Sequence, residues 1–585
     1  AFARPVQVIR SSAIAGQQSI QEQTTYFNDL VHWVLGQVKE VDNLSTGEVE
    51  ELNVYNPDAT LRSHARFGET LLSYTYNTAG QLSSFTDGNG QTTGLINYYR
   101  GIPRLINYPD GTSQAATVDD YGDITAVTDQ TGHTTGYSYN GIGRVTGVTY
   151  PGGDEVAWLP KTLAYDFVTS AERGVPANHW RRTTTIGNGV KVTYFDAMLR
   201  PVVSDSAIGS SVQDSVLNNY DAKGQKTFGA YPSASPLSFT TAPAVAGIKG
   251  VKTTYDALGR VTQTQQDSEL GVLTTSTAYL SGARQQVTDP KGNVTTSSYQ
   301  VFDAPAYDAV IKVQAPAGIT QTIARDLYGN PLSITQSGLY GTESNSVTKT
   351  LTYDSYHRLC RTTEPESGST VMAYDGANNL AWSADGLAIT GTGCGQDQVL
   401  AAARTTRTYD AMNRVTMIQP PSGTQNTSYG YDAMGRMTCA VTAGTCSPVS
   451  GASIWSATYN FRGLLTGESL QLAGQNAWGI GYAHDAYGSV SLIHYPDGEN
   501  VSYAPDALGR ATQVGSYASG LTYFPDGEVK DFVYGNGAVY AAEKNTRQLV
   551  SNISYGQGAM PLISEDYAYD ANGNIIGESI RYCNG

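Results

Sequence analysis

Charged side chains are scarce in this sequence, and basic ones are the scarcer kind. Asp, Glu, Lys and Arg make up only 15% of the 585 residues, whereas roughly 25% is usual for a soluble domain. The 52 acidic residues outnumber the 36 basic ones, which gives a formal net charge of −16. Affinity for nucleic acid depends on clustered Lys and Arg, and no such cluster occurs, so we expect no nucleic-acid partner.

Long apolar runs are missing as well. No stretch approaches the roughly 18 consecutive apolar residues that suggest a membrane-spanning helix, so we expect no membrane span. Residues 1–17 lack the basic and then apolar segments of a signal peptide. The sequence begins with Ala1 rather than Met, and we therefore expect a further segment to precede it.

Cysteine is rare, with five residues at Cys360, Cys394, Cys439, Cys446 and Cys583. The odd count and the lack of a Cys-x-x-Cys pair argue against zinc ligation. Cys439 and Cys446 are close enough to close a hairpin, and Cys360 could join Cys394 across neighbouring units. Free thiols are the alternative for each pair, and the sequence leaves both possibilities open.

The motifs of common enzymes are absent. The chain has no Gly-x-Ser-x-Gly elbow, no Gly-x-x-x-x-Gly-Lys-Ser/Thr loop and no His-Glu-x-x-His helix. Its histidines are scattered, at His32, His64, His133, His179, His357, His484 and His494. Only the last two are near one another, and on adjacent strands they could face a common point, although two ordinary sheet histidines are the simpler interpretation. We expect no catalytic, cofactor-binding or metal-binding residue, and no enzyme.

Two acidic stretches are minor candidates. Residues 86–90, Thr-Asp-Gly-Asn-Gly, have the closely spaced oxygens of a calcium loop but lack the remaining ligands and the closing Glu of an EF-hand. Glu364 and Glu366 flank a proline and could form a carboxylate pair for glycosidic chemistry. A plain exposed turn is the simpler interpretation of each stretch.

What the sequence does contain is glycine and tyrosine, with 63 Gly and 40 Tyr against 12 Phe. This composition favours strands joined by many tight turns. One six-residue unit recurs as Tyr-Asp-Ala-Leu-Gly-Arg at 255–260, Tyr-Asp-Ala-Met-Gly-Arg at 431–436 and Tyr-Asp-Ala-Asn-Gly-Asn at 569–574. Looser copies begin at Tyr76, Tyr139, Phe195, Tyr409 and Pro505.

A second turn type alternates with the first. It is clearest as Pro-Asp-Gly at 109–111, 496–498 and 525–527. One full cycle takes 21 residues from Tyr353 to Tyr374 and 22 from Tyr409 to Tyr431. In each turn the Asp or Asn side chain starts the reversal and the following Gly accepts a positive φ, so the pattern predicts one hairpin per cycle.

The segments between turns alternate β-branched and polar residues, as in Arg-Val-Thr-Gln-Thr at 260–264, which predicts strands of about six residues. Tyr suits such a sheet better than Phe if its ring packs on the next unit while its hydroxyl reaches water or the backbone. We therefore expect the tyrosines to be structural residues. About 55 strands are expected, and at ~4.8 Å per strand they form a ribbon about 260 Å long.

The repetition resembles the YD or RHS repeats of bacterial Rhs proteins, of the B and C components of Tc toxins and of teneurin ectodomains. Longer phrases at 26–36, 174–180, 266–273 and 379–383 are similar to those of bacterial Rhs polymorphic-toxin carriers. Recognisable units begin near Leu71, which divides the chain into a β-rich lead-in at 1–70 and a repeat shell at 71–585, less regular at 159–181 and 204–250.

The resemblance implies an antiparallel ribbon that spirals into a hollow cocoon. It also implies a secreted or cell-surface bacterial protein that encloses and helps deliver a C-terminal toxin polypeptide or another enclosed chain, possibly with a secretion-system component or a glycan as a further partner. The family's autoproteolytic core contains Asp-Pro-x-Gly-Leu, and we expect that core and the toxin to be absent. Residues 289–292, Asp-Pro-Lys-Gly, fall in register with the turn series, and we expect a turn there.

Three functions are compatible with these features of the sequence. The leading hypothesis is a carrier shell. The alternative is a surface adhesin or carbohydrate-binding module in which exposed aromatic rings stack on sugars. A hydrolase in the irregular residues 159–250 has the least support. Around a cavity ~60 Å across, the ribbon would wind between one and two times, too little to seal a compartment, so we expect an incomplete shell.

Overall fold

The computed structural model describes residues 4–341, 343–421, 425–446, 451–557 and 560–582. Within these ranges the chain forms 47 strands and three single 3-10 turns, η1 (Pro316–Gly318), η2 (Gln396–Gln398) and η3 (Ala401–Ala403), and no α-helix. The predicted all-β fold is confirmed. The described part also contains no helix that is long and apolar enough to cross a bilayer.

The ribbon makes two coils, and the first coil comprises β1–β24. Its strands are β1 (Gln7–Arg10), β2 (Ile20–Asp29), β3 (Val34–Asn43), β4 (Glu48–Tyr55), β5 (Leu61–Arg66), β6 (Glu69–Tyr76), β7 (Leu82–Asp87), β8 (Thr92–Tyr99), β9 (Ile102–Asn107), β10 (Ser113–Val118), β11 (Ile124–Thr128), β12 (Thr134–Tyr139), β13 (Val145–Thr149), β14 (Lys161–Val168), β15 (His179–Ile186), β16 (Gly189–Phe195), β17 (Pro201–Ile208), β18 (Ser211–Tyr220), β19 (Lys226–Ala230), β20 (Gly250–Tyr255), β21 (Val261–Ser268), β22 (Gly271–Leu280), β23 (Arg284–Thr288) and β24 (Val294–Tyr299).

The second coil comprises β25–β47. Its strands are β25 (Val310–Gln314), β26 (Thr320–Arg325), β27 (Pro331–Tyr340), β28 (Glu343–Tyr353), β29 (Leu359–Glu364), β30 (Gly368–Tyr374), β31 (Leu380–Leu387), β32 (Thr405–Tyr409), β33 (Val415–Gln419), β34 (Thr427–Tyr431), β35 (Met437–Thr442), β36 (Ile454–Tyr459), β37 (Leu465–Gln471), β38 (Ala477–His484), β39 (Val490–His494), β40 (Asn500–Ser502), β41 (Gln513–Val514), β42 (Ala518–Tyr523), β43 (Val529–Tyr534), β44 (Ala538–Lys544), β45 (Val550–Gln557), β46 (Met560–Tyr569) and β47 (Ile575–Tyr582).

Consecutive strands pair antiparallel along the chain, as the hairpin pattern predicts. The pairing runs from β1–β2 to β39–β40 in one 40-stranded sheet, and β41–β47 form a second, seven-stranded sheet. A one-residue register shift recurs where a strand enters a Tyr-Asp turn, for example between Thr254 and Tyr255 and between Gly430 and Tyr431. These bulges increase the local twist, which helps the ribbon to curve.

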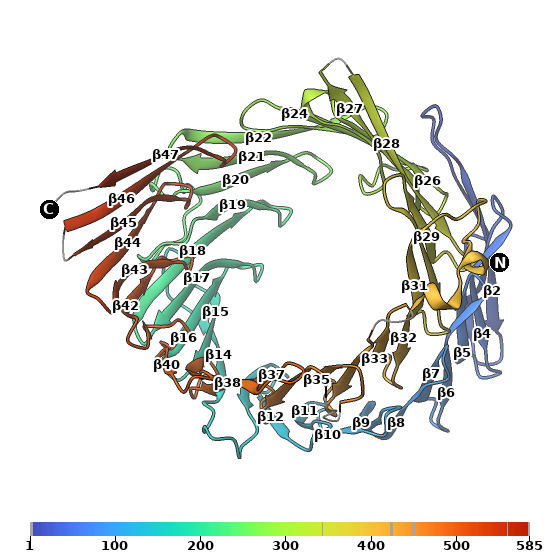
Figure 1. Cartoon of the computed structure of the whole chain (residues 1–585), viewed down its shortest axis with the longest axis horizontal. Helices are drawn as coiled ribbons and strands as arrows, with labels where there is room; N and C mark the ends of the chain where they lie inside the picture. Colours follow the sequence, from blue (N-terminus) through green and yellow to red (C-terminus); the bar gives the residue numbers. More distant parts are fainter. Residues whose placement is uncertain (1–3, 342, 422–424, 447–450, 558–559, 583–585) are drawn as a thin grey trace.

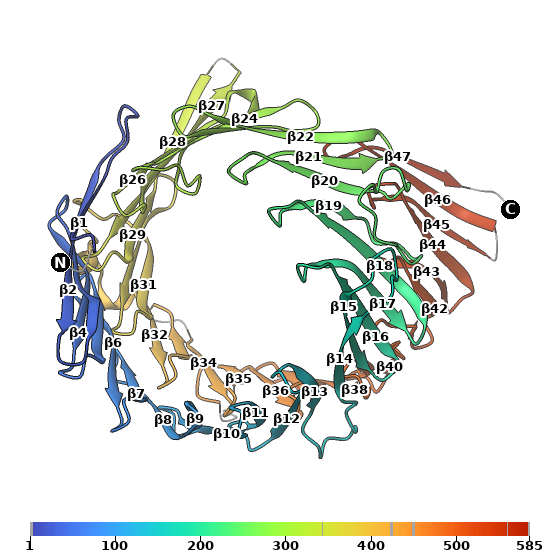
Figure 2. The ribbon, with the colours of Figure 1, turned by 180° about the vertical axis from the view of Figure 1, so that it is seen from behind.

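The ribbon curves into a ring around an open centre. Figure 1 shows β6–β14 on the lower side, β15–β24 on the left and top, and β25–β32 on the right, after which the chain passes the lower side again. The same path is seen from behind in Figure 2, where no strand crosses the centre. The two described ends lie on opposite sides of the ring.

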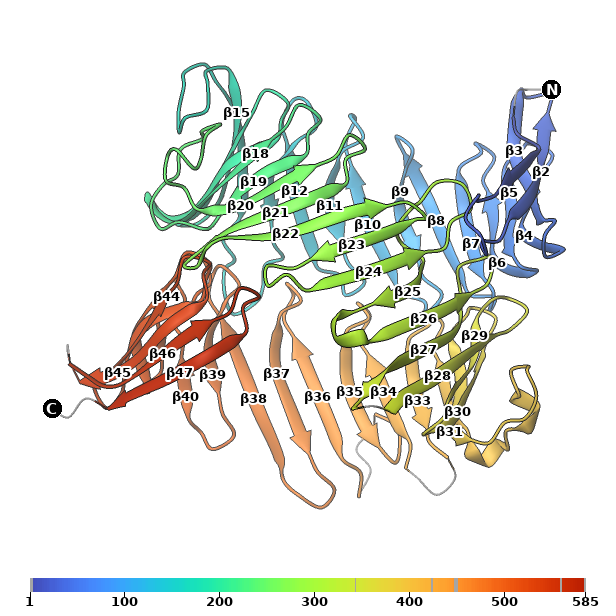
Figure 3. The same ribbon diagram turned by 90° about the horizontal axis from the view of Figure 1, so that it is seen from above.

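The second coil lies beside the first rather than inside it. Seen from above, the strands labelled β7–β12 and those labelled β33–β40 form two tiers (Figure 3). Side-chain hydrogen bonds between the coils join residues 278 to 326 positions apart, which is the length of chain that one circuit occupies. The expected winding of between one and two circuits agrees with this, and the shell is open.

The expected number of strands, about 55, was too high. Two long connections, residues 231–249 and 388–404, contain no strand and instead fold over the ribbon. Before residue 70, β2 and β3 form an antiparallel pair in which each strand has ten residues. The division of the chain at residue 70 stays a prediction, since β5 pairs directly with β6 in one continuous sheet.

Buried apolar side chains gather in two small clusters, each beneath one of these long connections. Val202, Val203 and Leu217 on β17 and β18 belong to the first, which residues 231–249 cover through Leu237 and Phe239. The second cluster comprises Val371, Ala384 and Val399. Elsewhere the ribbon is a single layer, so its stability depends mainly on contacts between neighbouring strands, as in other repeat proteins.

Candidate functional site: the repeat turns and the seam between coils

The aspartate side chain closes each Tyr-Asp turn. Asp256 Oδ1 accepts the backbone N–H groups of Leu258 and Arg260, both at 2.9 Å. The N–H of Gly259 donates to the Asp256 carbonyl at 3.1 Å. The Arg260 N–H makes the largest contribution to holding the pKa of Asp256 below its ordinary value. The same side-chain pattern closes the turns that begin at Asp119, Asp196, Asp432, Asp506 and Asp570.

The arginine that ends the unit attaches it to the next one. Arg260 Nε donates to Asp256 Oδ2 at 2.7 Å, while its guanidinium carbon lies 4.0 Å from the ring centroid of Tyr279. Arg436 likewise lies 4.6 Å from the ring centroid of Tyr459. The same two contacts are made by Arg200, Arg358, Arg414 and Arg510. A cation over an aromatic face is stabilising, so each unit holds the following tyrosine in place.

The hydroxyl groups of the repeat tyrosines bind the backbone of the preceding strands. Tyr139 donates to the Ile124 carbonyl at 2.7 Å, and Tyr431 donates to the Val415 carbonyl at 2.8 Å. Equivalent bonds are made by Tyr76, Tyr255, Tyr353, Tyr374, Tyr409, Tyr459, Tyr523 and Tyr569. The predicted reason for Tyr over Phe is confirmed. Burial raises the pKa of Tyr139 and Tyr431, so both remain donors at neutral pH.

Several turns lack the consensus glycine, and the turn at residues 195–200 offers a test of turn chemistry. In residues 195–200, Leu199 occupies the position that Gly259 holds in the consensus, and both have positive φ, 61° and 85°. The Leu199 side chain is 55% exposed and contributes little burial. We expect Leu199→Gly to raise the free energy of unfolding by about 1 kcal/mol, because the left-handed conformation opposes a Cβ. Urea unfolding measures this, with Gly259→Leu as the opposite substitution, and equal stability of Leu199→Gly and wild type would refute the account.

The second feature is a seam, which we define as the line of contacts between the first and second coils. At one end, Glu48 lies between two side chains of the other coil. Tyr328 donates its hydroxyl proton to Glu48 Oε2 at 2.6 Å, and His357 Nε2 is 3.3 Å from Glu48 Oε1. The ring of Phe67 packs against both, with centroid distances of 5.2 Å to Tyr328 and 4.1 Å to His357. The seam therefore combines ring packing with polar contacts.

Further along the seam, the turn formed by residues 86–90 contacts the second coil. Asp87 Oδ1 accepts the N–H groups of Asn89 and Gln91 at 3.0 and 2.8 Å, while Oδ2 accepts from Asn413 Nδ2 of the second coil at 2.8 Å. Asn89 Nδ2 in turn donates to Asp375 Oδ2 at 2.9 Å. The Asp87 oxygens, which belong to the minor calcium-loop candidate, thus accept hydrogen bonds within the turn and across the seam.

The far end of the seam joins two Asp turns. Lys291 Nζ is 2.7 Å from Asp570 Oδ2, and Asn572 Nδ2 donates to Asp289 Oδ2 at 2.7 Å. Residues 289–292 form a turn between β23 and β24, in which the Gly292 N–H donates to the Asp289 carbonyl at 3.0 Å. The prediction of a turn at this Asp-Pro-Lys-Gly is confirmed.

Acid is expected to weaken this end of the seam. The hydrogen bond from Lys291 is the main reason that the pKa of Asp570 lies below its ordinary 3.8. A carboxylate with a lowered folded-state pKa stabilises the fold above the unfolded value, and this stabilisation is lost as the pH falls through the folded-state pKa. The urea midpoint for β46 and β47 should therefore fall as the pH drops below about 4. Asp570→Asn should be less stable at the higher pH and show a smaller fall; an equal fall in both proteins would contradict the assignment.

The two histidines that the sequence placed on adjacent strands do line one cavity. It has a volume of about 390 Å³, lies at the seam, and is also lined by Trp158 of the first coil and Phe461 of the second. Burial lowers the pKa of His484, and His494 Nδ1 lies 2.5 Å from Asn500 Oδ1. Among the described residues no carboxylate is hydrogen-bonded to either ring, so the pair has no acid–base partner of the kind that activates a nucleophile.

The other polar candidates have partners of their own. Glu364 accepts hydrogen bonds from Lys349 at 2.6 Å and from Ser367 at 3.0 Å. Lys349 holds the pKa of Glu364 below its ordinary value, the reverse of the raised pKa that a glycosidase acid needs. In the irregular region, the buried ring of His179 lies 2.8 Å from the Pro176 carbonyl and 3.1 Å from Glu172.

Both cysteine pairs left open by the sequence are disulfides. Cys360 and Cys394 are joined across 34 residues, with Cα atoms 5.3 Å apart, and tie the connection at 388–404 to β29. Cys439 and Cys446 are joined across 7 residues, with Cα atoms 6.1 Å apart. Cys583 lies outside the described residues.

Comparison with known proteins agrees with the repeat geometry. The family model described as RHS Repeat matches residues 118–155, which cover three consecutive turns, at 119–122, 129–132 and 140–143, and the strands beside them. The chain therefore contains an RHS repeat. Sequence reasoning found the turn residues of this RHS-repeat chain, but it missed the seam residues, because contacts across some 280 residues leave no local pattern.

Two solved structures resemble the RHS-repeat chain over nearly its whole length. The crystal structure of TcdB2-TccC3-Cdc42 has a TM-score of 0.62 at 12% identity, covering 98% of this chain and 39% of that one. The crystal structure of TcdB2-TccC3 has a TM-score of 0.50 at 14% identity, covering 96% of this chain and 34% of that one. At these identities the likeness concerns the fold, and this RHS-repeat chain spans well under half the length of either match.

Proposed function

We propose that this chain is a structural carrier: part of an RHS shell that encloses a C-terminal toxin polypeptide and helps to deliver it in bacterial competition or virulence. The observation that carries the proposal is the ring of two coils joined along a seam, which surrounds an open centre without crossing it (Figures 1 and 3). The likeness of its fold to TcdB2-TccC3 supports a role beside toxin chains.

The use of the tyrosines favours a carrier over an adhesin. Glycan-binding aromatic rings need an open face. The rings of the repeat tyrosines instead lie under arginine guanidinium groups, and their hydroxyl groups donate hydrogen bonds to backbone carbonyls. The same contacts favour a scaffold over an enzyme, because the regular polar groups of the turns are engaged in holding the ribbon together.

The proposed location is outside the bacterial cytoplasm, either secreted or at the cell surface. Two disulfides in a chain with few cysteines support this, since disulfides persist mainly in oxidising compartments. The enclosed polypeptide is the proposed partner, and the net charge of −16 speaks against nucleic acid.

Limited proteolysis of the full-length protein that carries this chain tests the proposal. The toxin segment is expected to survive protease concentrations that digest the same segment when it is produced alone. Weakening the seam by Arg547→Ala should expose the segment to cleavage before the ribbon itself is cut. Digestion of the segment at the same rate in the full-length protein and alone would overturn the proposal.

A further inference from the structure

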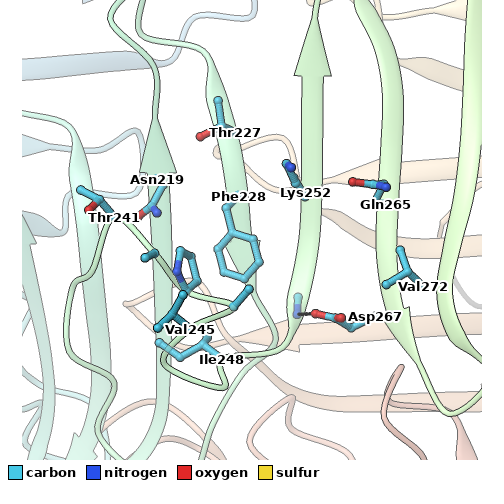
Figure 4. A pocket seen from close by; sticks show the side chains of 14 residues that line it. Asn219, Thr227, Phe228, Thr241, Val245, Ile248, Lys252, Gln265, Asp267 and Val272 are labelled. Carbon is cyan, nitrogen blue, oxygen red and sulfur yellow. Dashed lines mark hydrogen bonds between the residues drawn. The ribbon is translucent and has the colours of Figure 1, made fainter.

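A row of four side chains crosses β18–β21 on the face that residues 240–249 cover. Asn219 is directly opposite Phe228, Phe228 is opposite Lys252, and Lys252 is opposite Gln265. Residues directly opposite in an antiparallel sheet share a face, so the four side chains stand side by side. Figure 4 shows them in this order, with Val245 and Ile248 of the covering segment near Phe228.

The row forms one wall of a cavity of about 500 Å³, which Pro243, Val245 and Ile248 also line. This volume is in the range of small-molecule sites, which are mostly apolar with a few polar groups in fixed positions. Phe228 and Ile248 also pack on the buried cluster around Leu217, so these walls are held by the fold.

Asn219 presents an acceptor that nothing in the described protein uses. Asn219 is 9% exposed, and its Nδ2 donates to the Thr240 carbonyl at 2.9 Å. Because a carbonyl can only accept, this bond fixes which end of the amide is oxygen. Oδ1 is buried and has no hydrogen-bond partner among the described residues. A buried acceptor left unpaired is costly, and a ligand donor would remove that cost.

The other end of the row offers a cation. Lys252 and Gln265 line the cavity, and their side chains make no hydrogen bond or ion pair with any described residue. The nearby carboxylate of Asp267 is already engaged, by the Gly250 N–H at 3.0 Å and by Lys249 at 3.7 Å. In an acidic chain, the free ammonium of Lys252 is therefore available to an anion.

We infer that this cavity binds a small aromatic carboxylic acid that carries a hydroxyl or N–H donor at the end opposite its carboxylate. The donor bonds Asn219 Oδ1, the ring lies against Phe228, and the carboxylate meets Lys252 and Gln265. Asn219 and Lys252 are two strands apart, a backbone separation of about 10 Å, which suits a single ring with a polar group at each end.

The test uses para-hydroxyphenylacetate and isothermal titration calorimetry on the full chain. Saturable binding at one site is expected. Phenylacetate, which lacks the donor, and tyramine, which replaces the carboxylate by an amine, are each expected to bind about ten-fold more weakly, as the loss of one good polar contact implies. Absence of binding at millimolar concentration, or equal binding of all three compounds, would overturn the inference.

Two variants locate the site. Lys252→Gln alters an exposed side chain and is expected to weaken the binding of para-hydroxyphenylacetate about ten-fold and to abolish its preference over tyramine. Asn219→Leu should remove the preference for the hydroxyl group. Lys226→Gln is the matched control, since Lys226 is on the neighbouring strand β19 and outside the cavity lining, and its affinity should equal that of wild type. Wild-type affinity in Lys252→Gln, with an unchanged melting temperature, would also refute the assignment.

Discussion

Replacing Arg547 with alanine is expected to detach β44–β47 from the first coil and to lower their local free energy of unfolding by about 3–5 kcal/mol. Arg547 is 6% exposed, and its Nη2 lies 2.7 Å from Glu269 Oε1 in the turn between β21 and β22. The same nitrogen donates to the Asp570 carbonyl at 2.8 Å. Removing the guanidinium leaves a partly buried carboxylate and a carbonyl without their partner, which is why the expected effect is large.

Hydrogen exchange followed by mass spectrometry measures this local effect, because a long repeat array does not unfold in one step. Arg436→Ala is the matched control. Arg436 donates to the aspartate of its own turn, at 2.7 Å to Asp432, and lies over Tyr459, but it forms no hydrogen bond or ion pair across the seam with any described residue. Its loss should raise exchange only in β35–β37. Equal changes in β44–β47 for both variants would show that Arg547 does not hold the coils together.

Leu217→Ala is expected to lower the free energy of unfolding of β16–β19 by about 3 kcal/mol, within the usual range for a fully buried leucine. Leu217 is 0% exposed and packs with Val202 and Val203 beneath the connection at 231–249. The cavity left by the side chain cannot be refilled easily, because Arg173 fixes that connection through a hydrogen bond from its Nε to the Leu237 carbonyl at 3.0 Å.

Leu258→Ala provides the comparison for this second prediction. Leu258 is 78% exposed in a repeat turn, so its truncation should change stability by less than about 0.5 kcal/mol. Thermal unfolding together with hydrogen exchange in β16–β19 distinguishes the two variants. If Leu217→Ala were no more destabilising than Leu258→Ala, the small cluster would not be the stabilising core that its burial indicates.

Most of the local structure could be predicted because the conformation of each turn is determined by the residues within it. In Tyr-Asp-Ala-Leu-Gly-Arg, Asp256 binds backbone groups two and four residues later, and Gly259 takes the positive φ. Tyr255 reaches the carbonyl of Lys226, a neighbour in the ribbon. Such short-range rules fixed the strand alternation, the hairpins and the structural role of tyrosine without knowledge of the global path.

The seam and the covered cavity could not be predicted, since they depend on how far the ribbon curves in one circuit. Glu48 and Tyr328 meet only because 280 residues bring the chain back to the same place. Small differences in twist at each bulge add up over that length, and no single residue encodes the sum. Asn219 is similarly ordinary in sequence, and its unpaired oxygen becomes visible only once residues 240–249 are placed over it.

Cryo-electron microscopy of the full-length protein tests the central claim most directly. The account predicts two coils in contact along the seam, closed at their ends by further ribbon or by a partner, with polypeptide density inside the ring. An open ribbon with an empty centre, in a protein that binds glycan arrays through its surface, would contradict the carrier function.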